Sequence, residues 1–294
     1  MNAYFQTAFR FLATSVSFIV ATTNVLADEP DWKVGLAQVK ITPEQPLVMA
    51  GYASRDRPFE KVTADLYAKA LALEDREGHL AVLVTTDLIG LSAAIAEPIC
   101  ARLAERAGLK RDQILLNSSH IHTGPALSLN SDRGSKSSPG DIHRTVEYTL
   151  KLQDRLVELV IESLKTREPA RLSWGTGVAN FVLSRRQNTP RGVILGMNAR
   201  APADRTVPVL RIDSADGRLR AILFGAATHN TTLRPNCYEI CGDYAGFAQA
   251  NLAERNPGVQ AMFMLGLAGD SDPYPRGTME LARKHGLELS QEVE

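Results

Sequence analysis

Residues 113–125, Gln-Ile-Leu-Leu-Asn-Ser-Ser-His-Ile-His-Thr-Gly-Pro, form the stretch on which the interpretation of this chain depends. The apolar run at 114–116 is typical of a buried strand, and the Thr-Gly-Pro sequence ends it. His120 and His122 follow the run with one residue between them. Side chains two apart in an extended chain point to the same face, so both imidazoles are expected to converge just past the strand end.

A His-x-His pair at a strand end allows two interpretations. Neutral imidazole is the commonest metal ligand and the usual acid or base near neutral pH, and open α/β sheets keep their sites at strand ends. The alternative is that His120 and His122 are simply two polar residues at the end of a strand. The remaining sequence has to decide between a metal site and this structural role.

The composition of the 294 residues is that of an ordinary globular protein. Apolar residues make up 44% and charged residues 22%, which is enough to build a sizeable core. The 33 basic and 33 acidic side chains cancel, so no basic excess exists for phosphate groups. Nucleic acid is therefore not expected as a partner.

The first 27 residues are expected to be a secretory signal peptide rather than part of the fold. Arg10 precedes a mainly apolar run at 11–21, and Val-Leu-Ala at 25–27 offers the small residues that a signal peptidase needs. An N-terminal anchor is the alternative. No later run approaches the roughly twenty apolar residues of a membrane span, so the domain at 28–294 is expected to be soluble and exported, either periplasmic or extracellular.

Hydrophobic patterns predict a mixed α/β domain, in which a sheet of parallel and antiparallel strands is flanked by helices. Strands alternate with helices near 80–118 and 219–292, which favours parallel pairing there. A hairpin is predicted around Asp-Arg-Glu-Gly at 75–78, and short strands within 170–213 are expected to add antiparallel pairs. The polar segment 128–142 is predicted to be a loop before a long helix, and this loop could cover a site.

Four predicted strands end in side chains that bind metals or transfer protons. The first ends in Asp87, the second in the histidine pair, the third in His229, and the fourth in Asp270 and Asp272. If these strands lie side by side, their ends share one rim, where imidazoles and carboxylates would form a divalent metal site with zinc as first candidate. Such a site favours hydrolysis. Tying a turn or capping a helix is the alternative role for Asp87 and Asp270.

The other histidines and a cysteine pair are expected to stand apart from this site. His79, His143 and His285 fall in turn, loop and terminal-helix contexts and are predicted to be surface residues. Cys237 and Cys241 could form a small-loop disulfide in an oxidising space or remain two thiols.

Four stretches resemble the N-terminal catalytic domain of the neutral/alkaline non-lysosomal ceramidases and their bacterial relatives. They are Val-Met-Ala-Gly-Tyr at 48–52, Asn-Ser-Ser-His-Ile-His-Thr-Gly-Pro at 117–125, Ala-Ala-Thr-His-Asn-Thr-Thr at 226–232 with Gly-Asp-Tyr-Ala-Gly-Phe at 242–247, and Gly-Asp-Ser-Asp-Pro at 269–273. Their order and spacing also match, and the resemblance covers nearly all of the chain after the signal segment.

The resemblance implies a ceramidase-type fold and a zinc-dependent hydrolase of N-acyl amides that acts on a small amphiphilic amide. By this resemblance His120 and His229 are zinc ligands, and His122 lies beside the metal-bound water and the substrate. Arg185 would hold the substrate or the developing oxyanion, with its neighbour Arg186 as the alternative.

The chain departs from the ceramidase pattern at two points. Ceramidases have a serine tied to catalysis in Gly-Asp-x-Ser-Pro, where this chain has Asp272, so it resembles a relative whose substrate is a different amide or ester. The family's further zinc ligands, a glutamate and a tyrosine, come from beyond the position of Glu294. We therefore expect either a truncated form of a longer protein or a metal shell completed from within by Asp87, Asp243 or Asp270.

Two other functions fit the same residues. A noncatalytic domain with an incomplete metal site would bind zinc weakly or not at all. A metal-dependent phosphoesterase would also use histidines and aspartates at strand ends. The sequence sets neither the strand order nor the oligomeric state.

Overall fold

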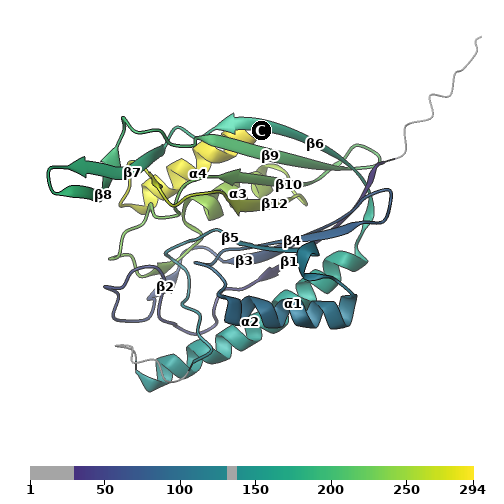
Figure 1. Cartoon of the computed structure of the whole chain (residues 1–294), viewed down its shortest axis with the longest axis horizontal. Coiled ribbons are helices and arrows are strands. Elements are labelled where there is room, and N and C mark those ends of the chain that lie inside the picture. The colour runs from purple at the N-terminus through teal and green to yellow at the C-terminus, as the bar shows by residue number, and fades with distance from the viewer. Residues whose placement is uncertain (1–29, 131–137) are drawn as a thin grey trace, which may run out of the picture.

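The computed structural model describes residues 30–130 and 138–294 (Figure 1). The predicted signal peptide at 1–27 lies outside these residues. The strands are β1 (Trp32–Lys40), β2 (Lys61–Val62), β3 (Tyr67–Glu74), β4 (Leu80–Thr86), β5 (Ile114–Ser118), β6 (Glu168–Val178), β7 (Val182–Thr189), β8 (Gly192–Asn198), β9 (Thr206–Ser214), β10 (Leu219–Ala226), β11 (Glu239–Ile240), β12 (Gln260–Leu265) and β13 (Ser271–Pro273). The α-helices are α1 (Ala93–Ala107), α2 (Pro139–Lys165), α3 (Asp243–Arg255) and α4 (Met279–Val293).

Eight strands form one sheet that folds back on itself. Their order is β12-β10-β9-β6-β1-β3-β4-β5, and the two central strands pair only from Trp32↔Ala170 to Val34↔Glu168. Figure 1 shows the half made of β1, β3, β4 and β5 stacked against the half made of β6, β9, β10 and β12. Apolar side chains fill the space between the halves, among them the fully buried Val34, Leu71 and Met262.

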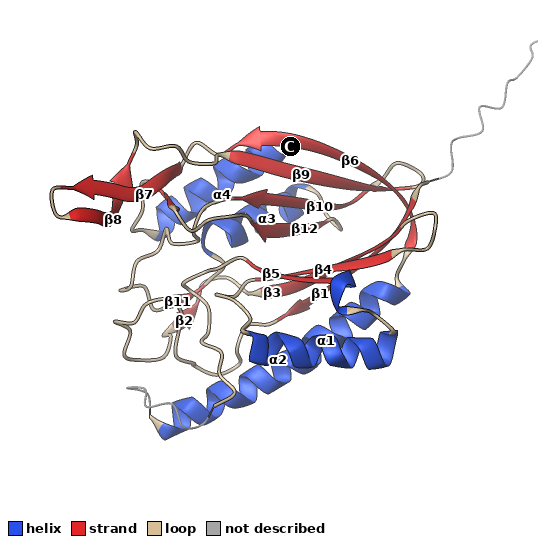
Figure 2. Cartoon of the chain, viewed as in Figure 1, coloured by secondary structure: helices blue, strands red, loops and turns tan. Residues whose placement is uncertain are grey.

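Helices cover the outer face of each half-sheet (Figure 2). α1 and α2 pack on β3, β4 and β5 through residues such as Ile99 and Leu156, both fully buried. α3 and α4 pack on β9, β10 and β12 through Tyr244 and Leu289. The result is four layers, helix, half-sheet, half-sheet and helix, in which the apolar strands β3, β4, β10 and β12 are largely buried on both faces.

The sheet is mixed, as the sequence predicts. β4 pairs with β5 and β10 with β12 in parallel, while β3–β4, β6–β9 and β9–β10 are antiparallel. Two smaller sheets accompany it, a parallel β2–β11 pair and the antiparallel order β13-β7-β8. The β7–β8 hairpin projects beyond the main sheet (Figure 1).

The two outer edges of the sheet meet. The Asn117 side chain on β5 donates to the Leu265 carbonyl of β12 at 3.0 Å and accepts from the Leu265 amide at 2.9 Å. A second link comes from Gln260 on β12, which donates to the Ala70 carbonyl on β3 at 3.1 Å. The histidine-bearing strands β5 and β10 therefore do not lie side by side in the sheet, contrary to the arrangement considered from the sequence, and only the folding of the sheet brings their ends together.

Three local expectations need correction or completion. The predicted loop at 128–142 ends early, because α2 begins at Pro139 and includes the exposed His143. His285 is not a surface residue, since it is 2% exposed and stacks on Phe181 with ring centroids 4.6 Å apart. Cys237 and Cys241 are both free thiols.

Throughout residues 30–130 and 138–294, no helix is long and apolar enough to cross a membrane.

Candidate metal centre

The loops that follow β5 and β10 join the two half-sheets at one end of the fold. His120 has a left-handed backbone with φ of 60°, and its amide donates to the Leu88 carbonyl at 2.9 Å. The next residue, Ile121, forms a parallel bridge with Asn230, whose side chain donates to the Ser119 carbonyl at 2.5 Å. The chain is therefore not extended at His120, and the bridge rather than strand alternation aligns the pair with the β10 loop.

Three imidazoles meet at this bridge. The potential ligand atoms of His120, His122 and His229 all lie within 4.8 Å of one another. The ring centroids of His120 and His229 are 4.7 Å apart, and those of His120 and His122 are 5.1 Å apart. Histidines from distant parts of the sequence thus lie around a single point.

Backbone carbonyls fix the orientation of two of these rings. Nδ1 of His120 lies 2.7 Å from the Ile89 carbonyl, and Nδ1 of His229 lies 2.7 Å from the Ala268 carbonyl. A carbonyl only accepts, so each Nδ1 carries a proton, and in the neutral ring Nε2 then keeps its lone pair. Protein metal sites commonly orient their histidines in this way. Burial also lowers the pKa of His229, which favours the neutral ring that a metal needs.

His122 is half-buried, and both of its ring nitrogens are buried without a hydrogen-bond partner among the residues that the structure describes. Burial, followed by repulsion from His120 and His229, lowers its pKa to about 3. The Tyr52 ring lies 4.7 Å from it, centroid to centroid. A buried polar ring without a partner is costly, so this imidazole is suited to a ligand, a water or a metal ion.

The donor set fits a divalent ion of intermediate character. Three neutral imidazoles are a known ligand set for zinc, with a further position left for water or substrate. Two Nε2 atoms with orientations set by carbonyl hydrogen bonds and one ring without a partner among the described residues are consistent with such an ion.

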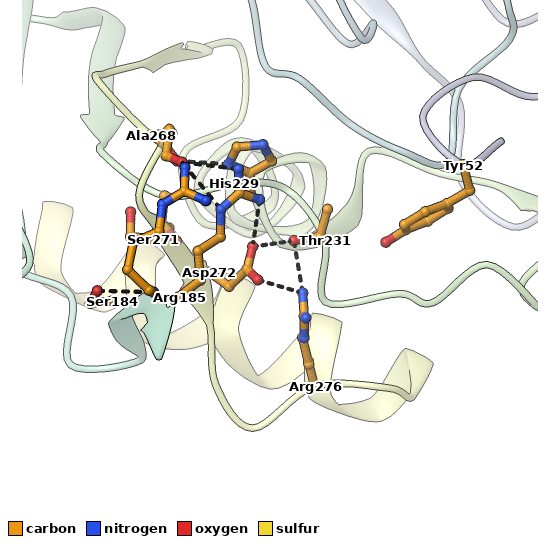
Figure 3. Close-up of polar contacts among 12 residues, drawn as sticks. Tyr52, Ser184, Arg185, His229, Thr231, Ala268, Ser271, Asp272 and Arg276 are labelled. Carbon is orange, nitrogen blue, oxygen red and sulfur yellow. Dashed lines mark hydrogen bonds and ion pairs between the residues drawn. The ribbon is translucent and has the colours of Figure 1, made fainter. Parts of the chain in front are cut away.

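A carboxylate and two arginines from different segments, Asp272 on β13, Arg185 on β7 and Arg276 after β13, lie close to His229 (Figure 3). Asp272 on β13 is 2% exposed and accepts from the Thr231 hydroxyl at 3.0 Å. It forms ion pairs with Arg276 at 2.8 Å and Arg185 at 3.4 Å. Arg185 also donates to the Gly269 carbonyl at 2.9 Å. Asp272 therefore holds the Arg185 guanidinium in place.

The neighbouring Arg186 is a weaker candidate for the same role. Its Nη2 donates to the Gly269 carbonyl at 2.9 Å, but its residue is exposed. Arg185 is more enclosed, with a side chain that is 17% exposed, and it exerts a charge effect on His122 and His229. The structure therefore favours Arg185 as the residue facing the histidines.

Asp87 lies at the end of β4 but stays outside the histidine group in the described part of the chain. Its carboxylate accepts from the Tyr67 amide at 2.9 Å and the Gln249 side chain at 3.1 Å. Gln249 in turn accepts from Lys69 at 2.8 Å. Burial raises the pKa of Asp87. The turn-tying alternative therefore describes this residue.

Asp243 and Asp270 also stay outside the group among the residues that the structure places. Asp243 is fully buried at the start of α3, where it accepts from the Leu233 amide at 3.0 Å and the Tyr244 amide at 2.6 Å. Asp270 is exposed to solvent. The candidate carboxylates therefore do not complete a metal shell in this arrangement.

The sequence analysis did not identify Arg55, a buried arginine that contacts the backbone of the histidine pair. Arg55 is 6% exposed and donates to the carbonyls of Ala50, His122, Pro235 and Cys237. It ties the polar loop after β1 to the segment that carries the histidine pair. No local pattern signals this role, because every partner is a backbone carbonyl and most are distant in sequence.

The four-layer fold and the histidine group define a class of α/β domain with a candidate metal centre where the sheet edges meet. The model of the family described as neutral/alkaline non-lysosomal ceramidase, N-terminal, matches residues 32–270. The chain belongs to this family.

Individual relatives agree with the family match. Neutral ceramidase A of Dictyostelium discoideum is 25% identical over 271 residues, which cover 86% of this chain and 37% of the relative. A solved structure of a ceramidase complexed with C2 has a TM-score of 0.75 at 21% identity, covering 90% of this chain and 43% of that one. Neutral ceramidase from Pseudomonas aeruginosa has a TM-score of 0.74 at 22% identity, covering 90% and 44%. The chain spans less than half the length of these relatives.

Proposed function

We propose that this chain is the metal-binding domain of a zinc-dependent hydrolase of N-acyl amides, similar to the ceramidases, with a small amphiphilic amide as substrate. The observation that supports the proposal is the convergence of three imidazoles, two of them with Nε2 lone pairs set by carbonyl hydrogen bonds. Family membership supports a hydrolase. Export, based on the pattern of residues 1–27, is part of the same proposal.

His120 and His229 would hold the zinc ion through Nε2. The bound ion supplies Lewis acidity, lowering the pKa of a bound water to roughly 7 and polarising a carbonyl oxygen. His122 stays neutral at physiological pH because burial lowers its pKa to about 3. Its ring can therefore orient a water molecule or the substrate without adding positive charge beside a cation.

Arg185 would bind the carbonyl oxygen of the substrate. Three of its donors contact Gly269 and Asp272, and a guanidinium has five N–H groups. Asp272 stands where the ceramidases have a serine, and we propose that it acts as a positioning residue through Arg185. A carboxylate there changes the chemistry available to the substrate, which supports a substrate other than ceramide.

A noncatalytic metal-binding domain is the second candidate. Among the described residues, the group contains three histidines and no carboxylate. A three-histidine site can bind zinc, yet turnover also needs substrate contacts, and the relatives that support the family match are more than twice as long as this chain.

Zinc content and hydrolysis test the proposal together. Metal analysis of the purified protein after dialysis is expected to give about one zinc per chain. The variants His120→Ala and His229→Ala should lose it, whereas His79→Ala, which removes an exposed histidine bound to Asp75, should keep it. A chain that binds no zinc in any condition contradicts the proposal.

Substrates then separate the candidate reactions. Shorter N-acyl amides should be cleaved in preference to a fluorescent ceramide, and the His120→Ala and His229→Ala variants should be inactive on both. Zinc binding without turnover of any amide would favour the noncatalytic domain. Cleavage of a chromogenic phosphodiester in place of the amides would favour a phosphoesterase.

A further inference from the structure

The β7–β8 hairpin exposes a run of apolar side chains. Val193, Leu195 and Met197 on β8 are 61%, 65% and 53% exposed, and Ile194 is 49% exposed. Alternate residues of a strand share a face, so Val193, Leu195 and Met197 form an apolar face of the hairpin and Ile194 extends it to the other side. Proteins rarely gather exposed apolar side chains in this way without a binding partner.

The same segment is strongly basic. Residues 182–205 contain five arginines against one aspartate, although the formal net charge of the whole chain is zero. Arg191 and Arg200 are exposed, and no ion pair holds either of them among the described residues. The hairpin therefore combines apolar side chains with unneutralised positive charge.

The hairpin is continuous with the rim of the histidine site. Arg185 and Arg186 on β7 both donate to the Gly269 carbonyl. The loop that contains Gly269 also contains Ala268, whose carbonyl orients His229, and Leu267, which is 94% exposed. Leu267 thus places a further exposed apolar side chain on the loop that contacts both the hairpin and His229.

We propose that the β7–β8 hairpin docks on an anionic phospholipid bilayer. Apolar side chains beside arginines partition to the boundary between headgroups and acyl chains, and anionic lipid attracts basic residues near its surface. The narrow, projecting shape of the hairpin and its exposure on both faces suit insertion between lipids. The bound bilayer would lie next to the loop that carries Leu267, so an amphiphilic molecule could pass from it to the site. Docking goes beyond the proposed hydrolysis and does not depend on it.

Vesicle co-sedimentation tests the docking without any turnover. The whole chain should bind vesicles of phosphatidylcholine with phosphatidylserine, and it should bind them less at high salt or when phosphatidylserine is omitted. Leu195→Asp should weaken binding at least roughly tenfold, because it places a charge in the lipid boundary. The double variant Arg191→Gln/Arg200→Gln should weaken it by roughly fivefold for each arginine.

The control is Leu150→Asp, which changes an exposed leucine, 50% exposed, on α2 away from the hairpin. It should bind vesicles as the wild type does, and all variants should keep wild-type zinc content and thermal unfolding. Three outcomes overturn the proposal. They are absence of vesicle binding by the wild type, an equal loss in Leu150→Asp, and a wild-type oligomer without vesicle binding that Leu195→Asp converts to a monomer. The last result would assign the hairpin to a protein interface.

Discussion

Single residues fix the geometry of the candidate metal centre. The histidines could be predicted from the sequence, because their type and their place after apolar runs indicate a site at strand ends. The orientation of their rings could not be predicted, because it depends on the Ile89 and Ala268 carbonyls and on a left-handed backbone at His120. Sequence patterns identify donors, whereas hydrogen bonds to distant carbonyls decide which lone pair faces the ion.

Position 51 requires glycine, because no side chain fits there. Its φ is +94°, and a Cβ there would lie 2.5 Å from Cγ and Nδ1 of His122. We expect Gly51→Ala to lower the free energy of unfolding by about 2–5 kcal/mol, through left-handed strain and displacement of the ring. Zinc affinity should fall as well. Chemical denaturation and zinc titration measure the two effects.

The matched control for this substitution is Gly78→Ala. Gly78 has a similar φ of +84°, but a Cβ there meets no atom within 4 Å. It should show only the backbone cost of about 1–2 kcal/mol, with zinc affinity unchanged. If both variants bind zinc like the wild type, the contact between Gly51 and the His122 ring does not position the histidine.

At the scale of elements, a buried polar network joins the half-sheets beneath the site. Lys69 on β3 donates to the Gln249 side chain on α3 at 2.8 Å and to the Ala261 carbonyl on β12 at 2.6 Å. Gln249 donates in turn to Asp87 at 3.1 Å. Asp87 precedes the residues whose carbonyls hold His120, so the network supports the candidate metal centre through the end of β4.

Gln249 is the partner that both buried charges share. We expect Gln249→Met to lower the free energy of unfolding by about 2–4 kcal/mol, because it leaves Lys69 and Asp87 each short of a hydrogen bond in a buried position. Gln187→Met, at an exposed position on β7, should change it by less than about 0.5 kcal/mol. Equal stability of the two variants in a denaturant titration would show that the network adds little.

Lys69 predicts a pH dependence of stability. Burial lowers its pKa to about 8 in the folded chain, partly opposed by Asp87, against roughly 10.4 when unfolded. Below about pH 8 the buried ammonium lowers the free energy of unfolding by its full desolvation cost. Between about pH 8 and 10.4 the unfolded state binds more protons than the folded state, so this cost decreases as the pH rises. Relative to Lys69→Met, the free energy of unfolding of the wild type should increase by about 2 kcal/mol between about pH 7.5 and 9.5. Unfolding curves with the same pH slope for both proteins would contradict this.

Helices and strands can be predicted from the sequence where the hydrophobic periodicity is strong. The start of a helix is harder to predict where capping residues, rather than periodicity, determine it. α2 begins in a segment that composition predicts to be loop. Ser138 accepts from the Asp141 amide at 3.2 Å, its own amide donates back to Asp141 at 3.3 Å, and Pro139 occupies the first helical position. This capping pattern is visible in the sequence, and the abundance of polar residues before it concealed the helix start.

At the scale of the whole molecule, the closure of the sheet creates the site. The β3–β4 hairpin and the parallel pairs β4–β5 and β10–β12 could be predicted, because each joins strands that follow one another in the chain directly or with one α-helix between them. The meeting of β5 with β12 could not, since it depends on Asn117 and Leu265, which are 148 positions apart, and on the short pairing of β1 with β6. His120 follows a strand of one half-sheet and His229 follows a strand of the other. Changes that loosen the contact between the sheet edges should therefore lower the affinity for a metal ion.

Asn117 offers a direct test of this coupling between closure and metal binding. Its side chain replaces a pair of strand hydrogen bonds between the sheet edges, and Asn117→Ala removes both. We expect the free energy of unfolding to fall by about 1–3 kcal/mol and zinc affinity to fall by roughly tenfold, the factor that about 1.4 kcal/mol represents. Asn188→Ala, at an exposed position on β7, should leave both quantities at the wild-type level. An Asn117→Ala variant that loses stability yet binds zinc like the wild type would show that the His120 and His229 loops hold each other in place without the sheet edges, through the bridge between Ile121 and Asn230.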